Sequence, residues 1–382
     1  MSNLSKNKIS WVNVFILTIS IVSSLFVVEI LSRFIIPPPP TPQGVPYFYN
    51  FIDKEIYKLG LMNFHEELGW VSKPDTRGYS LFGEFQSFDS MGNRNNDNYI
   101  PLKEKPLILA IGDSYTFGSE INNNETWPSQ LENSLGIKVI NGGVGGYGFG
   151  QMLTRTKGLL EELPVDILIV AITKPVIDTR VKQIVRHGIP KPYYSIQKSG
   201  NLVLHKVSQN VTVKKQDFFK YIFGYSYTLH LMMSKFYPSY WLADSIYDMQ
   251  YLDINEVEIS YKIFDEFEKL VKRNIIQHFV LALLPTSAGD VSLRQHPVSI
   301  YAKTMAEKND RIYVVDIQLI FSQKQNNQPI RNFFNDTTVG YHGHYNKEGA
   351  KLVAETLTSY LYENKIISMT RKRGEKFKSL SE

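Results

Sequence analysis

The sequence predicts an α/β protein, a three-layer α/β/α sandwich with a parallel sheet of about five strands, preceded by one transmembrane helix. Short apolar and β-branched runs alternate with longer runs of helical periodicity. Continuous apolar strands of this kind belong in a parallel sheet that helices cover on both faces. Near the N-terminus, an uncharged run of about 20 residues is long enough to cross the hydrocarbon core of a bilayer as a helix.

The candidate strands are short apolar runs spread along the body of the chain. They lie at residues 107–111, 138–141, 166–173, 279–284 and 312–317. Helix-like runs separate them, and this alternation indicates a parallel sheet with helices on both sides. Ligands of open α/β sheets bind at the carboxyl ends of the strands, so the residues directly after each strand are the candidates for function.

The stretch at about residues 185–250 interrupts this alternation. A hairpin pattern surrounds Ser199 and Gly200, and a later aromatic segment has the periodicity of an amphipathic helix. We interpret the stretch as an insertion near the site. The expected organisation is a transmembrane signal anchor at 1–36, a proline-rich spacer and irregular extension at 37–105, a main domain at 106–365 and a basic tail at 366–382.

The apolar run at residues 9–28 has the features of an uncleaved anchor. Lys6 and Lys8 precede it, so the positive-inside rule places the N-terminus in the cytoplasm and the main domain outside. A cleaved signal peptide is the competing interpretation, but the run continues through Glu29 to the prolines at 37–40 without a small-x-small cleavage site. We therefore predict a single-pass membrane protein with an extracytoplasmic domain.

Composition excludes several classes of site. The chain has no cysteine, which excludes disulfides, zinc fingers and thiol nucleophiles. Of the net charge of +5, Lys6 and Lys8 contribute +2 and the tail +3, which leaves the body neutral. A neutral body lacks the electrostatic footprint of a nucleic-acid partner. The basic tail is either a solvated end or a contact with anionic lipid.

A serine follows the first strand of the body, in the sequence GDSYTFG. Ser114 comes directly after Gly112 and Asp113, at a predicted strand-to-helix turn that would expose its hydroxyl. In the alternative interpretation, Asp113 and Ser114 only cap the next helix.

A glycine-rich segment, NGGVGGYGFGQ, follows the second strand. Gly143, Gly145 and Gly148 match the G-x-G-x-x-G pattern of dinucleotide-binding turns. That pattern also requires an acidic residue at the end of the next strand, where this chain has none. Glycines whose backbone N–H groups face an oxyanion fit the segment better.

Two histidines, His342 and His344, precede the last predicted helix in GYHGHYNKEGAKLVAE. They are metal ligands, or one is a general base, or both are ordinary loop residues. Without cysteine, a zinc site needs further histidines or carboxylates, and no other histidine forms an H-x-x-x-H partner for this pair. We therefore predict no metal and favour a general base.

Taken together, LAIGDSYTFG, ETWPSQLE, VINGGVGGYGFGQ and HYNKEGAKLVAE resemble the SGNH/GDSL hydrolase superfamily. They are similar in particular to its membrane-anchored bacterial members, which include relatives of polysaccharide O-acetylation proteins. The resemblance spans about residues 68–364 and makes 106–365 an SGNH-like catalytic domain. It implies no cofactor, and as partner an acylated small molecule or a glycan, at the bacterial cell membrane.

The resemblance also implies roles for individual residues. Ser114 is the nucleophile, its backbone N–H and that of Gly146 are oxyanion donors, and His344 is the general base. These roles are chemically coherent, because a serine hydroxyl needs a base to become a nucleophile and N–H donors stabilise the tetrahedral oxyanion.

Two positions differ from the pattern of the superfamily. The third block normally supplies an asparagine to the oxyanion hole, whereas this strand is followed by Lys174 and a proline, so Lys174 is the candidate donor. The orienting aspartate is also missing before the base, where Tyr341 and His342 stand. Asp336 is the nearest candidate acid. A Ser-His dyad, recruitment of Asp336 and an impaired site therefore remain as alternatives.

The predicted function is a membrane-anchored serine esterase or deacetylase that acts on ester-linked acyl groups, including those on glycans. An O-acetyltransferase that modifies a cell-surface polysaccharide would use the same serine chemistry with a sugar hydroxyl as acceptor. A catalytically impaired glycan-binding or scaffold protein with this fold is the third alternative.

Overall fold

The computed structural model describes residues 11–35, 61–79, 84–102, 105–186, 189–207, 219, 226–237, 250–287, 292–325, 330–335 and 343–368. The proline-rich spacer and the basic tail from residue 369 onward lie outside the described residues. So do three residues singled out before the last helix, namely Asp336, Tyr341 and His342.

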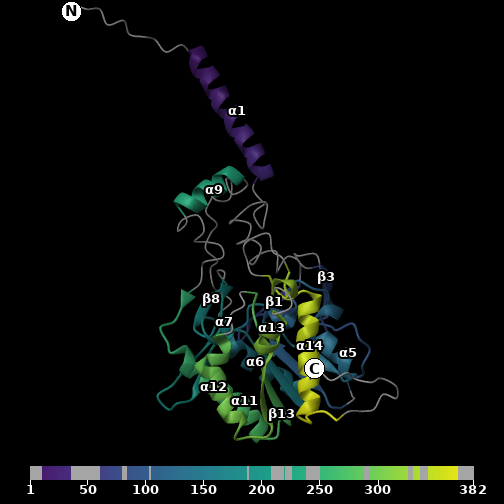
Figure 1. Cartoon of the computed structure of the whole chain (residues 1–382). Coiled ribbons are helices and arrows are strands. Elements are labelled where there is room, and N and C mark those ends of the chain that lie inside the picture. Colours follow the sequence, from purple (N-terminus) through teal and green to yellow (C-terminus); the bar gives the residue numbers. More distant parts are fainter. Residues whose placement is uncertain are drawn as a thin grey trace, which may run out of the picture.

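A five-stranded parallel sheet forms the centre of the fold (Figure 1). Its strand order is β14-β13-β7-β5-β6. Its strands are β5 (Ile108–Gly112), β6 (Val139–Asn141), β7 (Ile167–Ile172), β13 (His278–Leu283) and β14 (Ile312–Asp316). The predicted α/β class and parallel sheet are confirmed. Because β6 and β7 lie on opposite sides of β5, the direction of winding reverses at β5, and a ligand site is expected at its carboxyl end.

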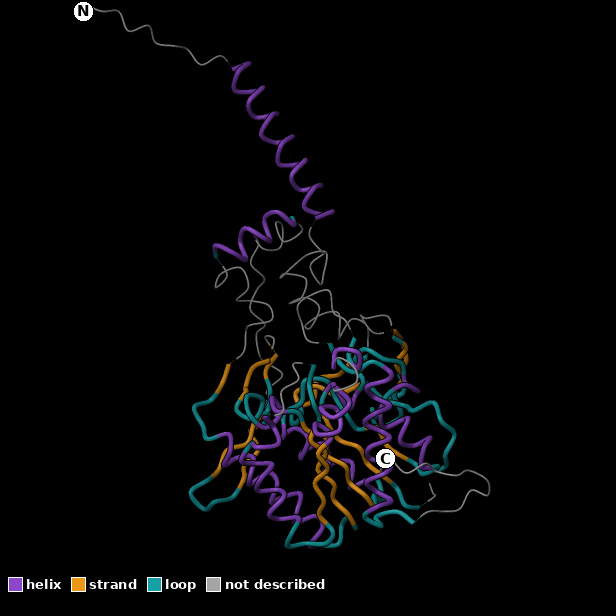
Figure 2. The backbone as a smooth tube through the Cα atoms, in the orientation of Figure 1, coloured by secondary structure: helices purple, strands orange, loops and turns teal. Residues whose placement is uncertain are grey.

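Helices cover both faces of the sheet, which completes the three layers (Figure 2). Alternate residues of a strand point to opposite faces. Leu109 and Ile111 of β5 pack on the side of α6, α11 and α12, whereas Ile108 and Ala110 pack on the side of α5, α13 and α14. These helices are α5 (Trp127–Leu135), α6 (Phe149–Glu162), α11 (Glu256–Lys272), α12 (Pro297–Ala306), α13 (Ile317–Gln325) and α14 (Lys347–Glu363).

Short strands outside the central sheet belong to the upstream extension and to the insertion. The predicted hairpin around Gly200 is present, since β10 and β11 pair antiparallel and Gly200 has φ +81°. The pairs and groups are β1 (Met62–His65) with β2 (Gly69–Ser72), β3 (Arg77–Tyr79) with β4 (Phe85–Ser87), β10 (Tyr193–Ile196) with β11 (Leu202–His205), and β8 (Gln183–Arg186) with β9 (Ile189–Pro190) and β12 (Gln250–Tyr251).

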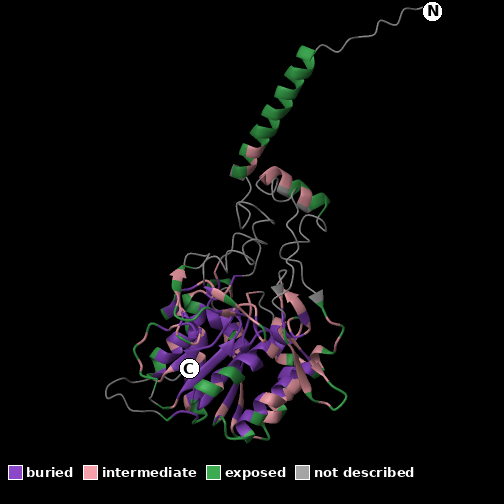
Figure 3. Cartoon of the chain, turned by 180° about the vertical axis from the view of Figure 1, so that it is seen from behind, coloured by how far each residue is buried: buried purple, intermediate pink, exposed green. Residues whose placement is uncertain are grey.

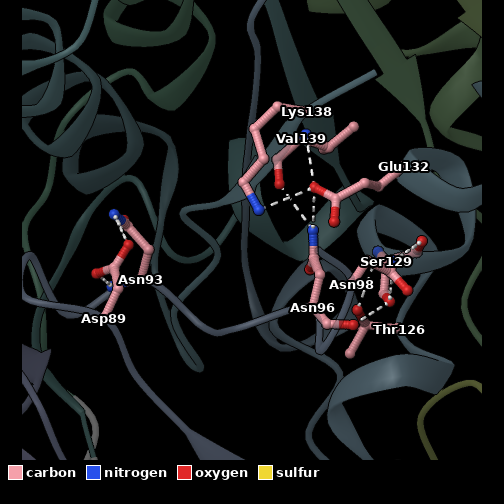
Figure 4. Close-up of polar contacts among 9 residues, drawn as sticks. All are labelled: Asp89, Asn93, Asn96, Asn98, Thr126, Ser129, Glu132, Lys138 and Val139. Atoms are coloured by element: carbon pink, nitrogen blue, oxygen red, sulfur yellow. Dashed lines mark hydrogen bonds and ion pairs between the residues drawn. The ribbon is translucent and has the colours of Figure 1, made fainter. Parts of the chain in front are cut away.

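The end of the upstream extension is bound to the main domain by buried polar contacts (Figure 4). The side-chain amide of Asn96 donates to Glu132 Oε2 at 3.1 Å and to the carbonyl of Val139 at 2.7 Å. Ser129 Oγ donates to the carbonyl of Asn96 at 2.7 Å. This part of the extension therefore packs on α5 and β6 and belongs to the same folded domain.

The N-terminal helix α1 (Trp11–Ile35) contains a candidate membrane span at Trp11–Arg33, with a mean hydropathy of 2.5. Its apolar side chains are exposed, in contrast to the buried centre of the domain (Figure 3). Near its end, the carboxylate of Glu29 accepts hydrogen bonds from the backbone N–H groups of Tyr227 and Thr228, at 3.0 and 3.1 Å. The insertion helix α9 (Tyr227–Phe236) thus begins against the last turns of α1.

Candidate active site

The serine turn is built by the end of β5 and the start of the short helix α4 (Ser114–Phe117). Asp113 caps this helix, since its side chain accepts from the backbone N–H of Tyr115 at 3.0 Å. A Cβ on Gly112 would lie 2.0 Å from Thr116 Oγ1, so only glycine allows the chain to turn this sharply. Ser114 is therefore held at the first position of a helix that follows β5, the strand at which the direction of winding reverses.

The structure brings Ser114 and His344 together, although 230 positions separate them in the sequence. His344 Nε2 lies 2.7 Å from Ser114 Oγ, and His344 Nδ1 lies 2.6 Å from Oε1 of Glu120. An ionised carboxylate only accepts hydrogen bonds, so Nδ1 carries the proton and Nε2 is free to accept from the serine hydroxyl. Both ring nitrogens are thus engaged in hydrogen-bond contacts with other side chains.

Glu120 is the acidic residue that sequence reasoning missed. It stands six residues after Ser114, in SYTFGSE, and its other carboxylate oxygen accepts the backbone N–H of His344 at 3.1 Å. The search for an orienting acid was confined to the residues just before the base, and it selected Asp336, which lies outside the described residues. The acid instead comes from the segment that carries the nucleophile.

The ionised form of Glu120 is stabilised in this position. Burial alone would raise the pKa of this carboxyl group, but the hydrogen bonds and the charge of His344 outweigh burial and lower it. Glu120 is therefore a carboxylate at neutral pH, the form that can hold the protonated Nδ1 of His344 and stabilise an imidazolium.

The lowered pKa of Glu120 predicts a pH-dependent contribution to stability. The contribution is full above the unfolded pKa, about 4.3 for glutamate, and is lost as the pH falls through the lower pKa of the folded state. We therefore expect the Tm difference between wild type and Glu120→Gln to shrink between about pH 6 and about pH 3. Thermal melts followed by circular dichroism measure it, and a difference that is constant over this range would contradict the assignment.

The base is held by the residues that follow it. The hydroxyl of Tyr345 donates to the buried carbonyl of Pro285 at 2.8 Å, and Asn346 caps α14 by accepting the N–H of Gly349 at 2.9 Å. A Cβ on Gly349 would lie 2.1 Å from the carbonyl of Phe333, so this position also requires glycine. In the motif HYNKEG, His344 is therefore followed by Tyr345, which anchors the loop, and by Asn346, which caps α14. Gly349 allows the backbone of α14 to approach Phe333 closely.

Arg94 supports the loop that carries Glu120. Its buried guanidinium donates to the carbonyl oxygens of Phe117, at 2.7 Å, and of Ile121, at 2.5 Å, and also to that of Gly118. These carbonyls lie on both sides of Glu120, so one side chain from the upstream extension determines the path of the acid-bearing segment. Sequence reasoning found no role for Arg94, because nothing in its own segment marks it as buried.

We predict that Arg94→Gln destabilises the fold by about 3–5 kcal/mol, because it leaves several buried carbonyls without their charged donor. Chemical denaturation measures the loss. Arg77→Gln changes the net charge by the same amount at an exposed position of β3 and serves as the control. A variant of Arg94 as stable as the Arg77 control would show that the guanidinium does not hold the loop.

The glycine segment after β6 packs directly against the serine turn. A Cβ on Gly143 would lie 2.5 Å from the backbone nitrogen of Phe117, and Val144 N–H donates to the carbonyl of Gly112 at 3.1 Å. Gly146 has φ +81°, a left-handed conformation that favours glycine. Within the described part of the chain, the N–H groups of Ser114 and Gly146 donate to no other residue, so both are available to an oxyanion.

The end of β7 also reaches the serine turn. Thr173 Oγ1 donates to Asp113 Oδ2 at 3.2 Å, and Lys174 begins the next helix, α7 (Lys174–Ile177). Arg180, just beyond α7, donates to the same carboxylate oxygen at 2.6 Å. The third block of the sequence is therefore tied to the residue before Ser114, although it lacks an asparagine.

Comparisons with known proteins return solved structures alone, since no family model and no curated protein matches the chain. A lipolytic protein of the G-D-S-L family from Desulfitobacterium hafniense is 16% identical, covers 67% of this chain and 99% of its own, and has a TM-score of 0.32. An acetylxylan esterase from Geobacillus stearothermophilus is 12% identical, covers 72% and 100%, and has a TM-score of 0.38.

An SGNH hydrolase from Slackia heliotrinireducens is 13% identical, covers 68% of this chain and 100% of its own, and has a TM-score of 0.34. These neighbours are SGNH/GDSL hydrolases, as the motifs predicted, whereas the narrower group of membrane-anchored O-acetylation proteins is not confirmed. Because the TM-scores lie below 0.5, the roles of individual residues rest on the geometry of this chain.

Proposed function

We propose that this chain is a serine esterase of the SGNH type that removes ester-linked acyl groups. One observation carries the proposal: Ser114, His344 and Glu120 form a continuous line of hydrogen-bond distances, 2.7 Å from hydroxyl to imidazole and 2.6 Å from imidazole to carboxylate. This arrangement of nucleophile, base and orienting acid is recognised by geometry and not by position in the sequence.

In the proposed reaction, Ser114 Oγ attacks the ester carbonyl carbon while its proton passes to Nε2 of His344. Glu120 stabilises the imidazolium that forms. The N–H groups of Ser114 and Gly146 stabilise the tetrahedral oxyanion, and Lys174 is the candidate for a third donor. His344 then gives its proton to the leaving alcohol oxygen, which leaves an acyl ester on Ser114. Water, deprotonated by His344, releases the acid in a second round of the same steps.

The location and the substrate class belong to the same proposal. The apolar span at Trp11–Arg33 and the two lysines before it support a single-pass anchor with the catalytic domain outside the bacterial cytoplasm. Acyl esters on cell-surface glycans would be substrates within reach of such a domain. Protease digestion of intact spheroplasts tests the topology, because a domain on the cytoplasmic side would stay protected.

The contacts of Glu120 also concern the third alternative, a catalytically impaired glycan-binding or scaffold protein. That alternative rested in part on the missing acid before His344, and the contacts of Glu120 weaken this support because they supply a carboxylate from another segment. The O-acetyltransferase alternative differs only in the acceptor of the acyl group, since a sugar hydroxyl would replace water in the second step.

Covalent labelling tests the proposal most directly. Full-length protein in detergent is treated with diisopropyl fluorophosphate and digested, and mass spectrometry identifies the modified peptide. We expect a single adduct on Ser114 and a parallel loss of 4-nitrophenyl acetate hydrolysis. The absence of both labelling and hydrolysis would overturn the esterase proposal. Acetyl transfer to an added oligosaccharide, without release of acetate, would replace it by the transferase.

A further inference from the structure

Three basic side chains from the segment after α7 and from the start of the insertion lie together beside the glycine segment of the site. They are Arg180, Arg186 and Lys191, and Lys191 is buried. Lys191 Nζ donates to the carbonyl of Arg180 at 2.6 Å, which ties the two segments together. The carboxylate of Asp113 pairs with Arg180 at 2.6 Å. Burial and the two arginines lower the pKa of Lys191 well below its usual value, so the charge at this edge comes from the two guanidinium groups, with Asp113 paired to one of them.

Arg186 lies against the residue that supplies an oxyanion donor. A Cβ on Gly146 would lie 2.9 Å from Nε of Arg186 and 3.2 Å from the ring of Trp70. Arg180, which donates to Asp113 and, at 3.3 Å, to the carbonyl of Tyr147, contacts residues next to Ser114 and Gly146. Both guanidinium groups thus border the place where the acyl group of a substrate would react.

The guanidinium of Arg186 differs from its neighbours in its contacts. Arg180 has a carboxylate and a carbonyl, and Lys191 has two carbonyls, at 2.6 and 3.5 Å. The side chain of Arg186 makes no hydrogen bond with any residue in the described part of the chain. Burial and then the charge of Arg180 lower the pKa of Arg186 to about 9, so the group still carries its charge at neutral pH. A half-buried guanidinium that has no hydrogen-bond partner among the described residues can accept an anion, which would offset the cost of its burial.

We propose that Arg186, with Arg180 beside it, binds an anionic group of the substrate, a carboxylate or a phosphate, next to the ester that Ser114 attacks. The inference deepens the proposed esterase function and rests on it for the identity of the ligand as a substrate. It narrows the substrate class to acyl esters of acidic molecules, such as glycans with uronic acid or phosphate groups. Guanidinium groups bind both oxyanions through paired, charge-assisted hydrogen bonds.

Binding to a Ser114→Ala background tests this inference without any need for turnover. The full-length variant in detergent is titrated calorimetrically with 4-acetoxybenzoate, with its neutral methyl ester and with 4-acetoxyphenyl phosphate. We expect at least one of the two anions to bind about tenfold or more tightly than the methyl ester, the range of a charge-assisted hydrogen bond. The stronger of the two anions distinguishes carboxylate from phosphate.

Variants of Arg186 decide whether this guanidinium is responsible for the tighter binding of the anions. Arg186→Gln should abolish the preference for the anion, and Arg186→Lys should keep part of it. Arg273→Gln removes the same charge at an exposed position after α11 and should leave the preference intact. Melting curves of the Gln and Lys variants show whether either one is unfolded.

Two results would overturn the inference. The anions could bind no more tightly than the methyl ester, or Arg186→Gln could weaken the methyl ester as much as the anions, which would indicate a role unrelated to anionic substrates. A failure of the esterase proposal would be detected in a different measurement, the hydrolysis of these esters by the wild type. In that case the wild type hydrolyses none of the three esters, whatever the affinities of the Ser114→Ala background.

Discussion

Replacing Ser114 by alanine is expected to lower kcat for aryl acetates by about 10⁴-fold or more. In the proposed mechanism Ser114 Oγ forms the acyl ester, and it is the hydroxyl oxygen that lies 2.7 Å from Nε2 of His344. Release of 4-nitrophenol by the full-length protein, before and after the substitution, measures the effect. Stability should change little, because the substitution removes a single small polar atom.

A matched substitution serves as the control for losses of activity that arise from purification or misfolding. Ser134→Ala removes a hydroxyl on the exposed side of α5, where it donates only to the carbonyl of Gln130. This variant should keep the rate of the wild type. Equal rates for wild type and Ser114→Ala would mean that Ser114 is not the nucleophile and that the observed hydrolysis belongs elsewhere.

Glu120→Gln is expected to lower kcat by about 10²–10⁴-fold while KM changes little. The amide no longer stabilises the imidazolium, and its NH₂ group can face Nδ1 of His344 and favour the wrong tautomer; a change of this kind in a related triad costs about 10⁴ in turnover. Comparing variants of Glu120 and Asp336 shows which of the two carboxylates orients His344. If Glu120 is the orienting acid, Asp336→Asn should cost far less than Glu120→Gln.

The control for these variants is Glu161→Gln, an exposed position on α6 that carries the same change of charge. It should behave as the wild type. A large loss for Asp336→Asn with a small loss for Glu120→Gln would reverse the assignment of the acid. Small losses for both would indicate a Ser-His dyad that works without an orienting carboxylate.

The sequence was sufficient for the fold, and it selected two residues, Ser114 and His344, that the structure places within hydrogen-bond distance. Apolar strands and the residues after them are local signals, so the five-stranded sheet and the serine turn at Ser114 could be predicted directly. His344 was found through its place before the last helix. In the structure its Nε2 lies 2.7 Å from Ser114 Oγ, and the residue stands two positions before Asn346, the cap of α14.

The acid and its support could not be predicted, because their signals are not local. Glu120 is one of many glutamates, and its role depends on a turn that folds back toward a histidine 224 positions later. Arg94 determines that turn from a third segment, through carbonyl oxygens that any residue could supply. Neither contact leaves a pattern in the spacing of residues along the chain.

The distribution of the site along the chain has a consequence for biosynthesis. Ser114 and Glu120 belong to one short segment near the first strand of the sheet, whereas His344 enters with the final helix, α14. A chain whose translation has not passed residue 343 contains Ser114 and Glu120 but not His344. On the proposed mechanism, activity therefore arises only after the preceding strands and helices have been synthesised, and a protein truncated before this point would lack the proposed base however well it folded.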